Sequence, residues 1–292
     1  MIIQSYKRYV PEFLRRTIYM VFLKDFLLFI EILRIRMAYL LSFLSINSEK
    51  KDAYKFMVKH GLTPYPWCFS SEYASREVNC VYDEISKMYY VIHNAKKLYF
   101  PITYSLEKVI AIYKSLLVEQ DIRSPHRYVE KYTTLRGKNL FDIGSAEGIF
   151  TLDAIDYIKH GYLFECDDFW VEALKMTFSP WENKITIIPK YITDKDSENE
   201  TSLDMFVQKE HITNLFLKMD IEGAELSALK GAETLLKNQN DVQMSICTYH
   251  TTKDANAISQ YLHSLGYQYS FTEGYLYFQR HLNKAVIRAA KN

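Results

Sequence analysis

The chain has 292 residues, of which 48% are apolar and 24% are charged, with a mean hydropathy of −0.19. This length allows one large domain or two ordinary ones, and the composition is typical of a folded globular protein rather than a disordered one. A net charge of +1 argues against nucleic acid as the main partner, and four widely spaced cysteines exclude a disulfide framework or a zinc knuckle.

Residues 1–60 differ from the rest of the chain in both charge and hydropathy. They hold 11 Lys or Arg and 5 Asp or Glu, a balance of +6 that leaves −5 for residues 61–292. Their longest uncharged stretch, residues 37–48, has 12 residues, whereas crossing a bilayer takes roughly 20. We therefore expect an amphipathic helical extension that packs on its own domain or on a second subunit, or rests on an anionic membrane surface. The expected location is cytoplasmic, with peripheral contact at the inner face of the membrane in the last case.

Residues 61–136 are predicted to form a small lead-in module. Short strands are expected at residues 78–83, 88–93 and 98–101, and a helix over residues 106–117. A loop marked by proline, residues 124–128, then leads into the main domain, which we place at residues 137–280.

From Asn139 onward, short apolar strands alternate with helical patterns. This alternation predicts a doubly wound α/β domain with a mostly parallel sheet. Two further strands, residues 267–271 and 275–278, are expected to close the sheet as an antiparallel hairpin, and residues 281–292 to form a basic C-terminal tail. The other expected strands are residues 139–143, 162–165, 184–188, 214–220 and 242–248, and the expected helices are residues 149–159, 169–177, 225–237 and 254–265.

The segment from Asp142 to Gly148, which leads from a strand into a helix, carries the first candidate site. Gly144 and Gly148 allow a tight turn and a close approach of a ligand to the backbone, beside the positive end of a helix. The segment lacks the middle glycine that a dinucleotide pyrophosphate needs, and it lacks the Gly-Lys-Ser/Thr of a phosphate-binding loop. A nicotinamide-dependent oxidoreductase is therefore disfavoured.

Glu165 ends the second strand of this domain, where an acidic side chain accepts hydrogen bonds from both hydroxyls of a ribose. An adenosine ligand with an amino-acid tail in place of phosphates is S-adenosylmethionine (SAM). The two motifs in this order therefore predict a SAM site. Taken alone, the glycine motif fits many turns, and Glu165 fits a solvated strand end.

Residues 217–225 read Leu-Lys-Met-Asp-Ile-Glu-Gly-Ala-Glu and lie at the end of the fourth strand. The carboxyl ends of parallel strands form the ligand crevice, so Asp220 and Glu222 are expected to point towards the site, with Lys218 as a further candidate. Acids so close together require a positive charge, supplied by Lys218, a metal ion or the sulfonium of SAM. The competing interpretation is that Glu222 and Glu225 only cap the next helix.

His250 follows the fifth strand and is expected at the same edge as Asp220. A histidine there is a candidate general base, although a lone histidine is more often structural or solvated. His126 and Arg127, upstream of the first strand, either close over the ligand or lie in a solvated loop.

The sequence resembles the FkbM-type methyltransferase family over roughly residues 124–279. The resemblance rests on residues 141–150, Phe164-Glu165, residues 201–204 and 229–232, and above all on residues 218–225. Two positions depart from it: Cys166 replaces a common proline, and residues 247–250 lack an acid that many relatives have there. The resemblance implies a class I SAM-dependent fold and O-methyl transfer to a hydroxyl of a carbohydrate or glycosylated acceptor, and it does not reach residues 1–60.

These expectations assign roles to named residues. We expect His250 to act as base, Asp220 to orient it or to contact the acceptor, and Lys218 to belong to the same catalytic set. A variant places Mg²⁺ or Mn²⁺ on Asp220, Glu222 and His250. The alternative function is a non-catalytic SAM-binding protein, or one that docks a membrane or a partner through the same fold. The residues expected to bind the cofactor are Asp142, Gly144, Ser145, Ala146, Glu147, Gly148, Glu165, Cys166, Tyr191 and Asp220, and those expected to bind the acceptor are Glu222, His126, Arg127 and Tyr249.

Overall fold

The structure is a computed structural model that describes residues 12–44, 48–239 and 241–291. The chain divides into two compact units, the first ending at Trp67 and the second beginning at Cys68. Residues 1–11 of the expected extension and Asn292 of the expected tail lie outside the described residues.

The first unit consists of two helices that pack against each other, α2 (Glu12–Ser42) and α3 (Ser48–His60). Ile35 on α2 and Ala53 and Met57 on α3 are buried. Within the described residues, every helix is too short or too polar to span a bilayer.

A small antiparallel sheet opens the second unit. It contains β1 (Cys80–Asp83), β2 (Met88–His93) and β3 (Lys96–Tyr99), near the strands expected in the lead-in module. The helix α4 (Leu106–Glu119) follows, and the Ser105 side chain caps it by accepting a hydrogen bond from the backbone N–H of Lys108. These elements belong to the same compact unit as the large sheet.

The centre of the second unit is a seven-stranded sheet with the order β11–β14–β10–β9–β4–β5–β6, in which β14 runs antiparallel to both of its neighbours. If β4 is taken as the first strand of the domain, this is the strand order of a class I methyltransferase. The expected fold class is therefore confirmed. The strands are β4 (Asn139–Ile143), β5 (His160–Phe164), β6 (Ile185–Ile188), β9 (Leu215–Met219), β10 (Gln243–Cys247), β11 (Gln268–Phe271) and β14 (Val286–Ala290).

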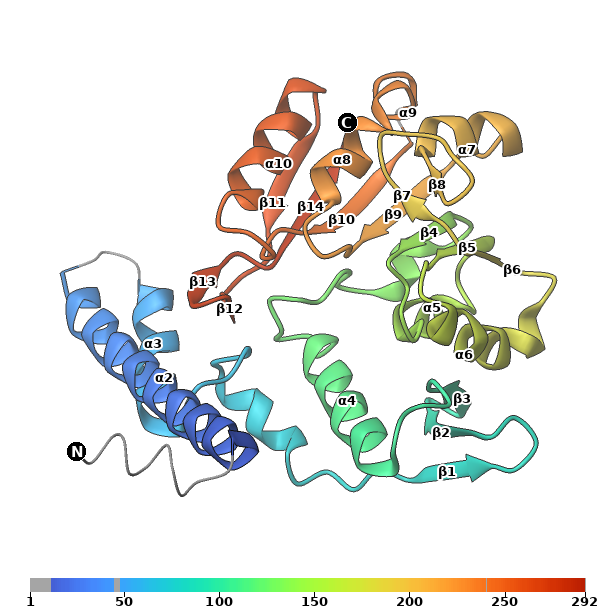
Figure 1. The fold of residues 1–292 in the computed structure, drawn as a ribbon. Helices are drawn as coiled ribbons and strands as arrows, with labels where there is room; N and C mark the ends of the chain where they lie inside the picture. Colours follow the sequence, from blue (N-terminus) through green and yellow to red (C-terminus); the bar gives the residue numbers. More distant parts are fainter. Residues whose placement is uncertain (1–11, 45–47, 240, 292) are drawn as a thin grey trace, which may run out of the picture. The chain divides into compact units, whose positions relative to one another are not determined.

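Helices cover both faces of this sheet, as Figure 1 shows. On one face lie α5 (Ile149–Ala154) and α6 (Asp168–Phe178). The other face carries α7 (Leu203–Glu210), α8 (Glu225–Lys230), α9 (Glu233–Asn238) and α10 (Asp254–Ser264). The strands between them are buried on both faces, as in parallel sheets generally, and Phe141, Leu217 and Ile246 are fully buried.

Short elements complete the second unit. Two ribbons pair β7 (Tyr191–Ile192) with β8 (Glu200–Thr201), and β12 (Leu276–Phe278) with β13 (His281–Asn283). Short 3₁₀ helices occupy Cys68–Tyr73, Tyr132–Leu135 and Ser179–Trp181.

The C-terminal segment differs from its prediction. An antiparallel pair does end the sheet, but β11 pairs with β14 and not with β12, which forms a ribbon with β13 instead. The expectation of a basic tail was therefore wrong, because Val286 and Ile287 are fully buried in β14 between β10 and β11. The single helix expected over residues 225–237 is divided into α8 and α9 at Gly231, where an added Cβ would lie 2.0 Å from the Thr193 carbonyl oxygen.

The strand register determines where the candidate site lies. Ile143 at the end of β4 pairs with Phe164 of β5 and Met219 of β9, and Met219 pairs with Ile246 of β10. The residues that follow these strands therefore meet at one edge of the sheet.

Candidate functional site

The turn after β4 depends on two glycines in the left-handed region. Gly144 has φ +74°, and a Cβ there would lie 1.9 Å from the Asp220 carbonyl oxygen. Gly148 has φ +77° at the start of α5, and a Cβ there would lie 2.7 Å from the Phe178 ring. Both positions exclude larger residues for steric as well as conformational reasons. The turn consequently packs directly against the backbone at Asp220.

A buried ion pair between Lys218 and Asp142 stabilises this turn. Lys218 Nζ lies 2.9 Å from Asp142 Oδ1, with the two side chains 5% and 1% exposed, and it also donates a hydrogen bond to the Gly144 carbonyl. Thr151 donates to the other oxygen of Asp142 at 2.6 Å. Burial disfavours the ammonium ion, but the carboxylates of Asp142 and Asp220 outweigh that effect and raise the pKa of Lys218 above its usual range.

Glu165, at the end of β5, faces the glycine turn. Its carboxylate accepts hydrogen bonds from the backbone N–H of Ala146 at 2.8 Å and of Asp167 at 2.9 Å. The next residue, Cys166, hydrogen-bonds the side chain of Tyr191. The register thus brings the expected cofactor residues of β4, β5 and β7 into one neighbourhood.

The turn itself provides a test of the expected cofactor. Ser145 is buried, and its hydroxyl oxygen has no hydrogen-bond partner among the described residues. A buried polar group without a partner is costly, and a bound polar ligand would relieve that cost. Together with Glu165 beside the turn, this unsatisfied hydroxyl fits a ligand such as SAM.

Opposite the turn, His250 lies between two acidic side chains. Its Nδ1 is 2.8 Å from Glu225 Oε1, and its Nε2 is 3.2 Å from Asp220 Oδ1, at ion-pair distance rather than in aligned hydrogen bonds. His250 and Glu225 are almost fully buried, whereas the Asp220 side chain is 20% exposed. Burial disfavours the imidazolium, but the two carboxylates outweigh it and raise the pKa of His250 to about 10.

Asp220 is the centre of this cluster. Tyr128 donates a hydrogen bond to its Oδ2 at 2.9 Å, and Tyr249 donates to its Oδ1 at 3.4 Å. His126 Nε2 lies 3.6 Å from Oδ2 and 3.2 Å from the Tyr249 hydroxyl. Burial opposes the negative charge, but contacts with His126 and His250 hold the pKa of Asp220 well below its usual range. Asp220 is therefore a carboxylate held by two tyrosines and two histidines.

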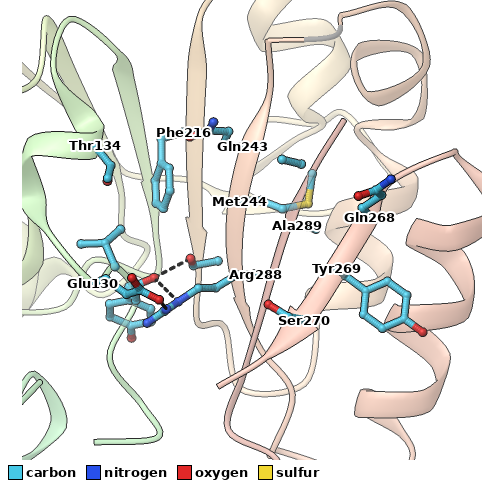
Figure 2. Close-up of a pocket in the computed structure, with 14 residues that line it drawn as sticks. Glu130, Thr134, Phe216, Gln243, Met244, Gln268, Tyr269, Ser270, Arg288 and Ala289 are labelled. Carbon is cyan, nitrogen blue, oxygen red and sulfur yellow. Dashed lines mark hydrogen bonds and ion pairs between the residues drawn. The ribbon is translucent and has the colours of Figure 1, made fainter. Parts of the chain in front are cut away.

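Residues 124–130, which we call the strap, bring His126 and Tyr128 to this cluster. Arg288 of β14 fixes the strap, donating from Nε to the Tyr128 carbonyl at 3.0 Å and from Nη2 to the Arg127 carbonyl at 2.8 Å. Ser245 of β10 donates to the same Tyr128 carbonyl at 2.7 Å. Figure 2 shows Arg288 reaching from β14 towards Glu130, beside a hollow of about 480 Å³ on the sheet face. Among the described residues that line this hollow, none is a predicted site residue.

The structure brings most of the predicted residues together and separates Arg127 from them. Arg127 donates to the carbonyl of Val129 and lines a different cavity, beside Tyr132 and Asp153, and so lies away from Asp220. Glu222 stands at the mouth of the site with its side chain 87% exposed, 3.8 Å from His250 Nε2.

Two residues of the site have roles that the sequence did not indicate. Tyr128 belongs to a loop without any periodic pattern, and its contact with Asp220 could not be foreseen. Glu225 was weighed as a helix cap, and its Oε1 does accept a hydrogen bond from the backbone N–H of Ile221 at 2.9 Å, but it also contacts His250.

The donor atoms that lie close enough to share a metal ion differ from the predicted set. Among the described residues, one group with such donor atoms is Asp220, Glu225 and His250, and another is His126, Asp220 and Cys247. Within the part of the chain that the structure describes, neither set includes Glu222.

Comparisons with known proteins agree with this picture. Residues 165–269 match the family model of the methyltransferase FkbM domain, a segment that holds Glu165, Asp220 and His250 and begins after the glycine turn. No curated protein matches the sequence.

Three solved structures illustrate the similarity in fold. A methyltransferase FkbM from Methylobacillus flagellatus KT has 19% identity and a TM-score of 0.43, with 62% of this chain and 52% of that chain covered, so the match spans about half of its length. A putative methyltransferase from Streptococcus mutans in complex with SAH has 12% identity and a TM-score of 0.39, with 55% and 93% covered. A putative RNA methyltransferase from Pyrococcus horikoshii has 14% identity and a TM-score of 0.36, with 55% and 76% covered. The family match agrees with the resemblance seen in the sequence: residues 165–269 are similar to the methyltransferase FkbM domain.

Proposed function

We propose that this protein transfers the methyl group of SAM to a hydroxyl of a carbohydrate-type acceptor, with His250 as the general base. The observation that carries the proposal is the series of contacts from Glu225 through His250 to Asp220, at 2.8 and 3.2 Å, next to the glycine turn, which packs on the backbone of Asp220. Glu225 contacts Nδ1 of the imidazole, and Nε2, which is itself buried, faces the Asp220 carboxylate, whose side chain is 20% exposed. This is the arrangement expected of a base oriented by a buried carboxylate.

The cofactor would lie along the glycine turn. SAM supplies an electrophilic methyl group on a sulfonium, so the protein has to position the acceptor in line with it and remove the hydroxyl proton. Glu165 is placed to accept hydrogen bonds from the ribose hydroxyls, and Ser145 has a hydroxyl available for the ligand. Lys218 is buried and holds Asp142 and the Gly144 carbonyl, which supports a positioning role rather than contact with the acceptor.

The acceptor hydroxyl would reach the buried His250 Nε2 from the side of Asp220 and Glu222, whose side chains are the more exposed ones next to it. When bound, SAM would supply the methyl carbon that the acceptor oxygen attacks, with the thioether of SAH as the leaving group, and the neutral form of His250 would accept the proton of that hydroxyl. The ring of Tyr249 lies beside that imidazole at a tilted angle of 41°, with centroids 4.2 Å apart, and is an aromatic group that a sugar can contact. The exposed carboxylate of Glu222 and the hydroxyl of Tyr249 can hydrogen-bond further hydroxyl groups of the acceptor. These polar and aromatic groups are the support for a carbohydrate acceptor.

The charges of the cluster support methyl transfer without a divalent ion. An imidazolium at His250 and the ammonium of Lys218 already offset two of the negative charges carried by Asp142, Asp220 and Glu225. A turnover rate that changes by less than about twofold when EDTA is added would agree with this view. A turnover rate that depends on added Mg²⁺ or Mn²⁺ would instead favour the hypothesis of a metal ion bound at Asp220.

Calorimetric titration with SAM, with NAD as a parallel ligand, tests the cofactor site first. We expect binding of SAM alone, and weaker binding by the Glu165→Ala variant. A screen of glycans and glycosylated metabolites for SAH formation then tests the reaction. His250→Ala should bind SAM as the unaltered chain does and lose about 10²- to 10⁴-fold in turnover. SAM binding without turnover on any hydroxyl acceptor would favour the non-catalytic alternative.

A further inference from the structure

The helix α2 carries an apolar stripe along one side. Its six residues repeat at the three- and four-residue spacing that aligns side chains on a helix, and each of them is between 41% and 61% exposed. The stripe is about 21 Å long at 1.5 Å per residue. It consists of Phe26, Phe29, Ile30, Leu33, Met37 and Leu40.

The opposite side of α2 is the one that is covered. With about 100° between successive residues, Glu31, Ile35 and Ser42 fall roughly half a turn away from the centre of the stripe. These three residues are buried, with exposures of 9%, 2% and 7%. The packing of α2 on α3 therefore leaves the stripe outside the core of the first unit.

Two arginines border the stripe. Arg34 and Arg36 lie roughly a quarter turn to either side of its centre, by the same helical geometry. The stripe itself contains no charged residue between Phe26 and Leu40. Arginine side chains in this position can extend along an apolar surface while the guanidinium stays in a polar layer.

This pattern is what a helix needs to lie in the plane of a membrane interface. An apolar stripe of this size on a protein surface requires a covering partner. A second copy of the stripe would bring two extensions of +6 together, with like charges along the borders, whereas anionic headgroups would neutralise them. None of the described helices is long and apolar enough to span a bilayer.

We propose that α2 binds the surface of an anionic lipid bilayer, with the stripe entering the boundary between headgroups and acyl chains and with Arg34 and Arg36 contacting lipid phosphates. The inference does not depend on the acceptor or on the reaction of the second unit.

Co-sedimentation of the full chain with lipid vesicles tests the proposal. Vesicles of phosphatidylcholine with about 30% phosphatidylglycerol should bind the protein, and vesicles of phosphatidylcholine alone should bind it at least about tenfold more weakly. Leu33→Glu with Leu40→Glu should reduce binding at least about tenfold, because two charges enter the stripe. The matched control is Ile85→Glu with Ile122→Glu, which changes two isoleucines of the second unit that are 94% and 74% exposed, and it should bind normally.

A second pair of substitutions tests the charges. Arg34→Gln with Arg36→Gln should weaken binding to the anionic vesicles about thirtyfold and leave weak binding to phosphatidylcholine unchanged. Circular dichroism and SAM titration confirm that each variant is folded. Equal binding by the Leu33→Glu, Leu40→Glu variant and its control would overturn the proposal. A lipid-free dimer that this variant dissociates, without vesicle binding by the unaltered chain, would assign the stripe to a second copy instead.

Discussion

His250 Nδ1 lies 2.8 Å from Glu225 Oε1, and both side chains are almost completely buried. His250 therefore contacts a buried carboxylate through Nδ1, and its other nitrogen, Nε2, contacts the carboxylate of Asp220. The two acids fix the ring and favour its protonated form, so they also determine the pH at which it can accept a proton.

The first prediction concerns that protonation. Because its pKa is raised to about 10, His250 should remain an imidazolium between pH 6 and pH 8.5 in the free protein. An NMR titration of the imidazole signals, assigned by the loss of one signal in His250→Gln, measures this directly. If His250 is the base, kcat/KM should rise about tenfold per pH unit over the same range, since only the neutral fraction is active.

Asp220→Asn provides the matched comparison. Removing one of the two charges should lower the pKa of His250, and the midpoint of its titration should then move to lower pH. A rate that does not change between pH 6.5 and 9 in the unaltered chain would instead assign the proton to the carboxylate of Asp220.

The second prediction concerns the buried ion pair under the glycine turn. Lys218→Met leaves Asp142 buried without its cation, and removing one partner of such a pair costs about 3–5 kcal/mol of stability. Chemical denaturation should show that loss, and SAM affinity should fall because the Gly144 carbonyl also loses a donor. The double variant Lys218→Met with Asp142→Asn should recover part of the stability. A single variant as stable as the unaltered chain would contradict the role given to the pair.

The third prediction compares two glycines with similar backbone conformations. Gly144→Ala and Gly266→Ala each place a Cβ at positive φ, which costs roughly 1 kcal/mol. Only at Gly144 would the Cβ meet a neighbour, the Asp220 carbonyl at 1.9 Å, whereas nothing lies within 4 Å at Gly266. Gly144→Ala should therefore abolish SAM binding in calorimetry while Gly266→Ala keeps it. Equal affinities for the two variants would show that the close approach is unimportant.

The sequence predicted the elements that bring these residues together. Strands such as β4 and β9 are short apolar runs between helical patterns, and the carboxyl ends of parallel strands meet at one edge, so Gly144, Glu165 and Asp220 could be placed without coordinates. The position of β14 could not be predicted in this way, because the lysine and arginine residues in and around its sequence favour a tail. Its position between β10 and β11 depends on pairing with strands distant in sequence.

The charge state of the site could not be predicted from the sequence either. That state depends on distances between side chains from different elements, as with His250 after β10 and Glu225 at the start of α8. The contact of Tyr128 with Asp220 depends in the same way on how Arg288 and Ser245 hold the strap.

The last prediction concerns Glu147, the acid within the glycine turn. Burial, with a contribution from Glu119, raises the pKa of Glu147 to about 8, from an ordinary value near 4.5. Between these two values the folded state holds a proton that the unfolded state has lost, so stability falls as pH rises, by at most about 1.4 kcal/mol per pH unit. Glu147→Gln removes this dependence. Its Tm should therefore exceed that of the unaltered chain by a margin that grows from pH 5 to pH 8 and then stays constant. Glu84→Gln, which changes a glutamate whose side chain is 79% exposed, should show no growing margin. A constant margin for Glu147→Gln across this range would mean that the carboxyl is ionised in the folded protein, as it would be if it held a cation in the turn.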